Sequence, residues 1–355
     1  MNPVLKILTD YPRDDLAHDE VHQALVTACL KHGVAPANLD VGSIPGMDTV
    51  TAGFKTAQLA LNSNIGFGHV FHTNCAPRKN IVTAKSQGEK IVLGMTKTGV
   101  CVLMVNAGYA LTPFRAAAEA GDIAFYQTSV PDAGSQFRSR DFFPDALAEL
   151  AAHLAKQTPG DDVTAALKGL SYLGAPMDID AIPTLPKGTV FYTDNFGNIK
   201  LNIHHTELRA QYDAGEILAV RINDTVCDAV VGEAGFSQGE GMLALTSGSS
   251  GWPVAGDKNF FTEIFLRGGS ARERFSSAQA GDSVLMLREN DLKQVVDILR
   301  GIDRAAADRL DLHDMSEARV IKLLSRAELI NDCCDTTALT QSLKDGTVAK
   351  KVSAL

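Results

Sequence analysis

The stretch Val4-Leu-Lys-Ile-Leu-Thr-Asp10 opens the chain with a short apolar run that ends in two polar residues. A strand buried in a parallel sheet has this pattern, because both of its faces are covered while its carboxyl end reaches solvent. Residues 16–32 follow with apolar side chains at helical spacing, and Gly33 is suited to end that helix. The first residues therefore predict a strand followed by a helix, which is how an α/β fold begins.

The alternation continues through the first half of the chain. Apolar runs at 69–72, 90–93, 100–105 and 123–126 predict strands, and residues 51–61 and 145–156 predict helices. Strands that alternate with helices form a mainly parallel sheet, whose ligands bind outside the carboxyl ends of the strands. Asp10 and Asn74 both stand at such ends, which makes them the first candidate site residues.

The second half of the chain has a different pattern. Residues 174–188 form a proline-rich connector, and beyond it short strands are separated by turns rich in Gly, Asp and Asn. We expect these strands near 189–193, 199–203, 216–223, 226–231, 241–246, 261–266 and 282–288. The whole pattern predicts an α/β domain at 1–165, a linker at 166–188, a smaller antiparallel β-barrel-like domain at 189–290 and a helical extension for packing or assembly at 291–355.

The composition fits a globular protein and argues against several other classes. The chain is 45% hydrophobic and 21% charged, which are ordinary globular values. The net charge of −9 argues against a nucleic-acid surface, because phosphate binding needs a basic stripe. No run approaches the roughly 18 apolar residues of a membrane span, and the first residues do not resemble a signal peptide. The six cysteines lack metal-type spacing. Because no signal peptide is visible, we expect reduced thiols and a cytoplasmic protein.

Two pairs of histidines could suggest a metal site, but neither has the required pattern. His18 and His22 are four residues apart, but Asp19 stands where the zincin pattern needs a glutamate. His204 and His205 would point to opposite faces of a strand. The sequence therefore predicts no metal site, and we expect no bound cofactor.

The stretch Tyr192-Thr-Asp-Asn-Phe-Gly-Asn-Ile-Lys-Leu-Asn-Ile203 crowds Asp, Asn and Gly into a β-like run. Strands normally avoid these residues, so the segment must bend. It is either a β-bulge or turn with solvated amides, or a binding edge at which Phe196 stacks on a ring and polar groups hold a ligand. The sequence of this segment leaves both interpretations open.

That stretch resembles a strand of the S-adenosylmethionine hydroxide adenosyltransferases and their relatives, the fluorinase and chlorinase. Loose matches to the same family run in order from about residue 5 to residue 287. They are Ile7-Leu-Thr-Asp10, Asp40-Val-Gly-Ser-Ile-Pro-Gly-Met-Asp48, Gly68-His-Val-Phe-His-Thr-Asn74, Phe137-Arg-Ser-Arg-Asp141, Gly241-Met-Leu-Ala-Leu245, Gly248-Ser-Ser-Gly251 and Thr262-Glu-Ile264.

The resemblance implies an adenosyl ligand and assigns residues to its parts. Asp10 would accept hydrogen bonds from the ribose diol, and Phe196 would pack against the ligand. Asp194, Asn198 and Ser249 would bind the charged amino-acid end. Trp252 would cover the adenine, or it is an ordinary packed indole. The substrate-binding set implied in this way is Asp10, Asp14, Met47, Asp194, Phe196, Asn198, Ser249, Ser250, Trp252 and Glu263.

The residues expected to position the nucleophile depart from the family. The water-using members employ an Asp, an Arg and a His. This chain has Asn74 at the Asp position, Arg78 as the arginine and Arg138 at the His position. Ser139 stands where the hydrolases have glycine and the fluorinase has serine. The motif positions thus supply neither a carboxylate nor an imidazole as general base.

The resemblance implies cleavage of S-adenosyl-L-methionine at the C5′–S bond by direct displacement with water, giving adenosine and L-methionine. One alternative is the same displacement with another nucleophile, such as a halide, or with another adenosyl ligand. The other is a protein that binds an adenosyl ligand without catalysis. The family's homotrimers place the ligand between the first domain of one subunit and the second domain of its neighbour. We therefore expect a homotrimer whose partner is the small adenosyl ligand, with neither nucleic acid nor membrane as a partner.

Overall fold

The computed structural model describes residues 2–77, 89–129, 135, 137–158, 160–233, 238–302, 304–310, 312, 315–331 and 333–355. The chain divides into two compact units. The first comprises Met1–Thr184 and Trp252–Lys258, and the second comprises Leu185–Gly251 and Asn259–Leu355. The division between Thr184 and Leu185 falls inside the proline-rich connector. Residues 166–184 of the predicted linker belong to the first unit.

The first unit is built on a seven-stranded sheet with the order β2-β1-β3-β5-β4-β6-β7. Its strands are β1 (Val4–Thr9), β2 (Leu39–Ser43), β3 (His69–Asn74), β4 (Ile91–Thr96), β5 (Cys101–Val105), β6 (Ile123–Thr128) and β7 (Leu173–Pro176). Its helices are α1 (Leu16–His32), α2 (Thr49–Ala60), α3 (Arg115–Glu119), α4 (Arg138–Asp141), α5 (Phe143–Leu154) and α6 (Val163–Ala166), with 3₁₀ turns η1 (Pro36–Asn38), η2 (Thr112–Phe114) and η3 (Ile179–Ala181).

This sheet is mixed, whereas the sequence pattern suggested a mainly parallel one. Strands β2, β1, β3 and β5 are parallel, and β4, β6 and β7 run antiparallel to their neighbours. The reversal begins at β4 and β5, which are joined by a turn of only a few residues that contains Gly99 at φ 88°. So short a connection can only form a hairpin, because a parallel pair needs a long crossover.

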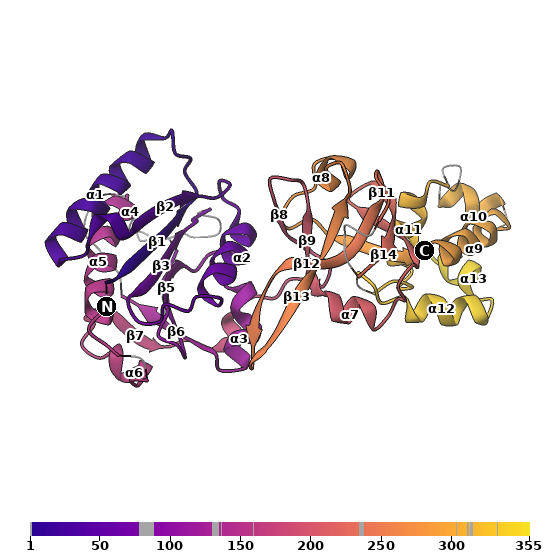
Figure 1. The fold of residues 1–355 in the computed structure, drawn as a ribbon. Coiled ribbons are helices and arrows are strands. Elements are labelled where there is room, and N and C mark those ends of the chain that lie inside the picture. The colour runs from indigo at the N-terminus through magenta and orange to yellow at the C-terminus, as the bar shows by residue number, and fades with distance from the viewer. Residues whose placement is uncertain are drawn as a thin grey trace. The chain divides into compact units, whose positions relative to one another are not determined.

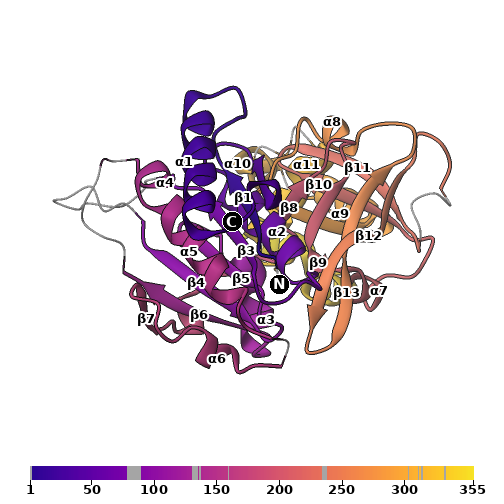
Figure 2. The same cartoon turned by 60° about the vertical axis from the view of Figure 1, so that its left-hand side comes forward.

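Helices cover both faces of the first sheet (Figures 1 and 2). Leu5 and Ile7 of β1 lie in the core that the sheet shares with α1 and α5. Leu8 points to the other face, where it packs with Ala52 of α2. This alternation follows from the two-residue period of a strand. Because helices cover both faces of β1, its carboxyl end, with Asp10, lies at the edge between the two helical layers.

The second unit contains another mixed seven-stranded sheet, with the order β14-β10-β11-β12-β13-β9-β8. Its strands are β8 (Val190–Thr193), β9 (Ile199–His204), β10 (Ile217–Ile222), β11 (Thr225–Val231), β12 (Leu243–Val254), β13 (Asp257–Leu266) and β14 (Val284–Arg288). The seven strands predicted from the sequence are all present. The expectation of a purely antiparallel arrangement is wrong at one pair, because β11 and β12 are parallel.

The C-terminal helices share the second unit with this sheet. The helices of the unit are α7 (His205–Arg209), α8 (Ala271–Arg274), α9 (Glu289–Arg300), α10 (Arg304–Arg309), α11 (Glu317–Arg326), α12 (Thr337–Lys344) and α13 (Val348–Ser353). Leu292, Val295 and Leu299 of α9 are buried in one cluster with Ala219 of β10 and Leu287 of β14. The predicted helical extension is therefore an integral layer on this sheet. Among the described residues, no helix is long and apolar enough to cross a bilayer.

Candidate functional site

Asp10 and Asn74 meet at the carboxyl edge of the parallel strands, as their positions in the sequence predicted. Thr9 and Asn74 are paired across β1 and β3. The Asp10 amide donates to the Asn74 carbonyl at 3.1 Å, and the Asp10 carboxylate accepts from the Ala76 amide at 3.4 Å. Asn74 is 8% exposed, while Asp10 is half-buried. The Asp10 carboxylate is thus held in place and still reaches the surface of this edge.

Two protonated side chains lie beside this carboxylate. Burial raises the pKa of the Cys75 thiol well above its usual value, and the charge of Asp10 raises it further, together with a hydrogen bond to that carboxylate. Burial also raises the pKa of Tyr11 to about 12, against hydrogen-bonding interactions with Ser139 and Asn74 that lower it. The Tyr11 hydroxyl makes no hydrogen bond of regular geometry to the described residues. Both groups stay neutral at physiological pH, so each can donate a hydrogen bond.

Arg138 and Ser139 enter the same edge from α4. Ser139 is 7% exposed and lies near the Tyr11 hydroxyl. Arg138 is half-buried, and its Nη2 donates to the main-chain oxygen of Glu89 at 3.3 Å. Three of the four residues predicted to position the nucleophile are therefore close together, namely Asn74, Arg138 and Ser139. Arg78 lies outside the described residues.

Two further predicted residues of the first unit are exposed around this edge. Asp14 lies in the loop before α1. Met47 is 67% exposed at φ 61°, in the turn before α2. Asp48, the next residue, accepts a hydrogen bond from the Thr51 amide at 2.9 Å and so caps α2. Met47 is consequently fixed in a strained turn with its side chain in solvent.

Trp252 belongs to the first unit through the tip of the β12–β13 hairpin. The indole is 4% exposed and packs edge-on against Phe54 of α2, with ring centroids 5.8 Å apart. This environment fits an ordinary packed indole. In this conformation the ring has little surface left to offer a ligand.

In the second unit, Asp194 organises the turn between β8 and β9. Its carboxylate accepts from the amides of Phe196 at 2.9 Å and Asn198 at 3.0 Å, and from the Asn198 side chain at 3.1 Å. Gly197 completes the turn at φ 82°, a conformation that favours glycine. The segment is therefore a hairpin turn. Phe196 stands 80% exposed at its tip, so it is available to pack against another molecule.

Lys200 links this turn to β13 and was missed in the sequence. Its ammonium lies 2.5 Å from Asp194 and 2.9 Å from Glu263, and its side chain is only 4% exposed. Burial raises the pKa of Asp194, but the hydrogen bond and charge of Lys200 outweigh it and leave that pKa below its usual value. Two carboxylates around one ammonium carry one net negative charge, so the cluster can attract a further cation.

The two predicted serines lie on β12. Ser249 is exposed, and Ser250 is 9% exposed. Gly248, just before them, faces Glu263: a Cβ at Gly248 would come 3.2 Å from the Glu263 Oε2. The absence of a side chain at Gly248 thus leaves room for the Glu263 carboxylate. Of the predicted residues in this unit, Asp194 and Glu263 are joined through Lys200, and Asn198 is hydrogen-bonded to Asp194.

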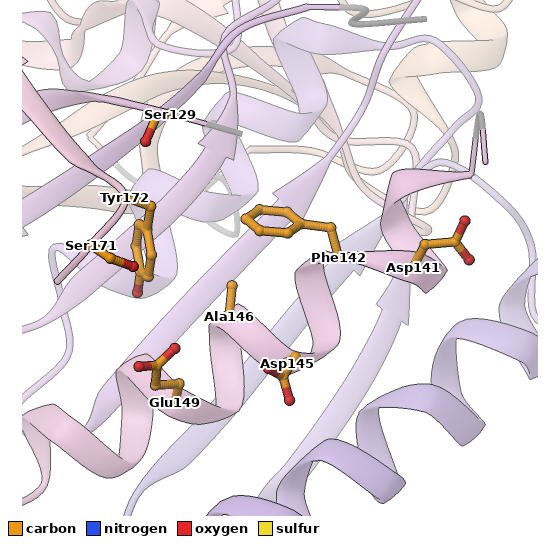
Figure 3. A pocket seen from close by; sticks show the side chains of 8 residues that line it. All are labelled: Ser129, Asp141, Phe142, Asp145, Ala146, Glu149, Ser171 and Tyr172. Atoms are coloured by element: carbon orange, nitrogen blue, oxygen red, sulfur yellow. The ribbon is translucent and has the colours of Figure 1, made fainter. Parts of the chain in front are cut away.

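A separate pocket of about 380 Å³ lies in the first unit and is lined by none of the predicted site residues. In Figure 3 the rings of Phe142 and Tyr172 project into it, and the carboxylate of Asp141 points away. Burial raises the pKa of the Tyr172 phenol. No group of residues that could hold a metal ion occurs in the described part of the chain.

The fold is similar to that of a solved structure. An uncharacterized conserved protein from Thermotoga maritima matches with a TM-score of 0.55 and 19% identity, over 80% of this chain and 100% of that one. A conserved hypothetical protein from Thermus thermophilus has a TM-score of 0.49 and 19% identity at the same coverages. The sequence matches no family model and no curated protein. The Thermotoga likeness shows a shared fold and nothing about activity.

Proposed function

We propose that this chain cleaves S-adenosyl-L-methionine at the bond between ribose C5′ and sulfur, with water as the nucleophile, giving adenosine and L-methionine. The observation that carries the proposal is the meeting of Asp10, Asn74 and Ser139 at one edge of the first sheet. These residues belong to separate motifs that resemble the S-adenosylmethionine hydroxide adenosyltransferases. Ligands of α/β sheets generally bind at the carboxyl edge.

In this proposal Asp10 holds the ribose. A carboxylate can accept hydrogen bonds from both hydroxyls of the diol. The amide of Ala76, at 3.4 Å, and the neighbouring thiol of Cys75 keep it oriented. The neutral Tyr11 hydroxyl and the Asn74 amide then offer donors for the attacking water or the ribose oxygens.

The cluster of Asp194, Lys200 and Glu263 would hold the amino-acid end of the ligand. Its net negative charge suits the α-ammonium group, and Lys200 suits the α-carboxylate. Phe196, exposed at the tip of the turn, would pack against the aliphatic part of the ligand. The proposal includes the trimer of the resembling family, in which a neighbouring subunit supplies this cluster, and a cytoplasmic location.

Incubation of the purified protein with S-adenosyl-L-methionine, followed by chromatographic separation of the products, tests the proposal. Adenosine and methionine in equal amounts are expected. If a different 5′-substituted adenosine forms, and only when a halide is added, the nucleophile is the halide and not water. If the ligand stabilises the protein against heat but no product forms, the chain is a binding protein without catalysis. If the ligand gives no product and does not stabilise the protein against heat, the adenosyl site itself is contradicted.

The trimer is tested by light scattering on the purified chain. The expected mass is about three times the 37.8 kDa of one chain. A monomer that still binds the adenosyl ligand would contradict the shared arrangement.

A further inference from the structure

A buried carboxylate lies at the carboxyl edge of the first sheet outside every motif considered above. Strand β4 runs antiparallel to β5, and its first residue, Ile91, pairs with Val105, the last residue of β5. Because β5 is parallel to β3 and β1, the start of β4 lies at the same edge as Asn74 and Asp10. Glu89 precedes that strand by two residues, so the topology brings it to this edge.

The surroundings of Glu89 are those of the candidate site. Its side chain is 6% exposed. Arg138 donates to the main-chain oxygen of Glu89 at 3.3 Å. The negative charge of Glu89, like that of Asp10, raises the pKa of Cys75. Glu89 is therefore a nearly buried carboxylate between the strand end that carries Asn74 and the helix that carries Arg138.

The other titratable groups at this edge are poor candidates for accepting a proton from water. Tyr11 and Cys75 keep their own protons at neutral pH, because their pKa values are raised. Asp48 is engaged as the cap of α2, and Asp10 is assigned to the ribose. His72 bonds to the Leu103 carbonyl at 2.9 Å, and burial lowers its pKa to about 4. Asp15 caps α1 by accepting from the Ala17 amide at 2.7 Å, and Asp14 is exposed. Among the described carboxylates at this edge, Glu89 is the most deeply buried.

We propose that Glu89 is the general base of the displacement reaction, an inference that rests on the proposed function. The water oxygen forms a bond to ribose C5′ while the C5′–S bond breaks and its electron pair goes to sulfur, which becomes the neutral thioether of methionine. The proton lost by the water passes to the Glu89 carboxylate. Arg138, hydrogen-bonded to the Glu89 main chain, is a positioning residue that fixes this segment.

The test is Glu89→Gln, which keeps the size of the side chain and removes its basicity. Adenosine formation should fall by about 10²–10⁴-fold, the usual contribution of a positioned base. The Kd of S-adenosyl-L-homocysteine, an analogue that lacks the methyl group and the sulfonium charge, should stay within about threefold of the wild-type value by calorimetry, because hydrogen-bond capacity and volume change little. Glu89→Asp should retain part of the activity. Glu149→Gln, an exposed carboxylate of α5, is the matched control and should leave the rate unchanged.

Sodium azide separates a base from a merely structural residue. Azide is already an anion and needs no base, so Glu89→Gln should still form 5′-azido-5′-deoxyadenosine with added azide while its adenosine formation stays low. The assignment would be overturned if Glu89→Gln lost both products equally, or if its Kd for S-adenosyl-L-homocysteine rose as the rate fell. It would also be overturned if Glu89→Gln formed adenosine at the wild-type rate. A wild-type protein that forms no adenosine overturns the proposed function and this inference with it. An active wild type with an equally active variant overturns the inference alone.

Discussion

At the scale of single residues, Asp10 is the side chain on which ligand affinity should depend most. Its carboxylate is oriented by the Ala76 amide and is half-buried, so its hydrogen bonds to a diol would be partly shielded from water. Asp10→Ala should weaken binding of S-adenosyl-L-homocysteine by about 2–3 kcal/mol, measured by calorimetry. Asp19→Ala, with 76% of its side chain exposed, should have no effect. Unchanged affinity in Asp10→Ala would remove that residue from the site.

Loss of Lys200 should strongly destabilise the second unit. Its side chain is 4% exposed and that of Glu263 is 10% exposed. Lys200→Met would leave two carboxylates close together without their cation, at a cost of about 3–5 kcal/mol in the free energy of unfolding. Urea denaturation measures the loss. Lys97→Met removes the exposed partner of Asp122 and should cost less than about 1 kcal/mol. Equal effects of the two changes would show that burial of Lys200 has no energetic consequence.

Asp194 should make stability depend on acid pH. Its pKa is lower in the fold than usual, because Lys200 and Asn198 outweigh the effect of burial. A carboxyl whose pKa is depressed on folding stabilises the protein above its unfolded pKa of about 3.9, and this stabilisation is lost as the pH falls through the folded value. Asp194→Asn should therefore lose about 1–3 kcal/mol at pH 7 and match the wild type more closely below about pH 4. Urea denaturation at a series of pH values tests this, and a pH-independent difference would contradict it.

The apolar pattern alone indicated candidate site residues only where they end a parallel strand. Asp10 and Asn74 follow apolar runs, so the sequence shows that they end parallel strands. Glu89 comes before β4, and its place at the same edge depends on β4 being reversed, which the apolar pattern of the strand does not reveal. Lys200 lies in an apolar stretch of β9, where its two carboxylate partners come from different elements. A pairing of that kind appears only once the strands are assembled.

At the scale of elements, the turn between β8 and β9 depends on Gly197. Its φ is +82°, and a Cβ there would lie 2.1 Å from the Ser270 Oγ and 3.0 Å from the Ser270 Cα. Ser270 caps α8, and the Arg272 amide donates to the Gly197 oxygen at 2.9 Å. The turn and the start of α8 are thus in direct contact, and a side chain at Gly197 would push them apart.

Gly197→Ala should therefore cost more stability than a change that affects backbone conformation alone. Gly215, at φ +86° with nothing within 4 Å of a built Cβ, is the matched control. Gly215→Ala should cost about 1 kcal/mol for the left-handed conformation, and Gly197→Ala about 2–4 kcal/mol, because strain and overpacking are added. Thermal and urea unfolding of both variants measure the difference. If the two variants unfold alike, the contact with Ser270 does not constrain the turn.

The elements themselves were largely predictable, and their directions were not. Apolar runs located β3 to β6 and all seven strands of the second unit, because a buried strand must be apolar. The runs missed β2, whose Leu39-Asp-Val-Gly-Ser43 is only partly buried, and β7, which is mostly exposed. They also could not show that β11 and β12 are parallel. Strand direction depends on which neighbours pair, and pairing is a property of the assembled sheet.

At the scale of the whole molecule, residues 291–355 should be required for the second unit to fold. Helix α9 buries Leu292, Val295 and Leu299 against Ala219 and Leu287 of the sheet, and α11 adds further apolar side chains to the same cluster. Their removal would expose one face of β10 and β14 to water, at about 25 cal/mol for each Å² of apolar surface. Large exposed apolar faces lead to aggregation or to a loosely packed state.

A chain ending at residue 290 should therefore lose cooperative unfolding of the second unit and bind a hydrophobic dye. Calorimetry and dye fluorescence measure these two effects. Removal of residues 354–355 alone, which are exposed, should leave both measurements unchanged. The first unit has its own core, formed by its sheet with α1 and α5, so its unfolding transition should persist in the truncated chain. If the truncated chain instead unfolds in the same two transitions as the full chain, the C-terminal helices are a dispensable addition to the sheet.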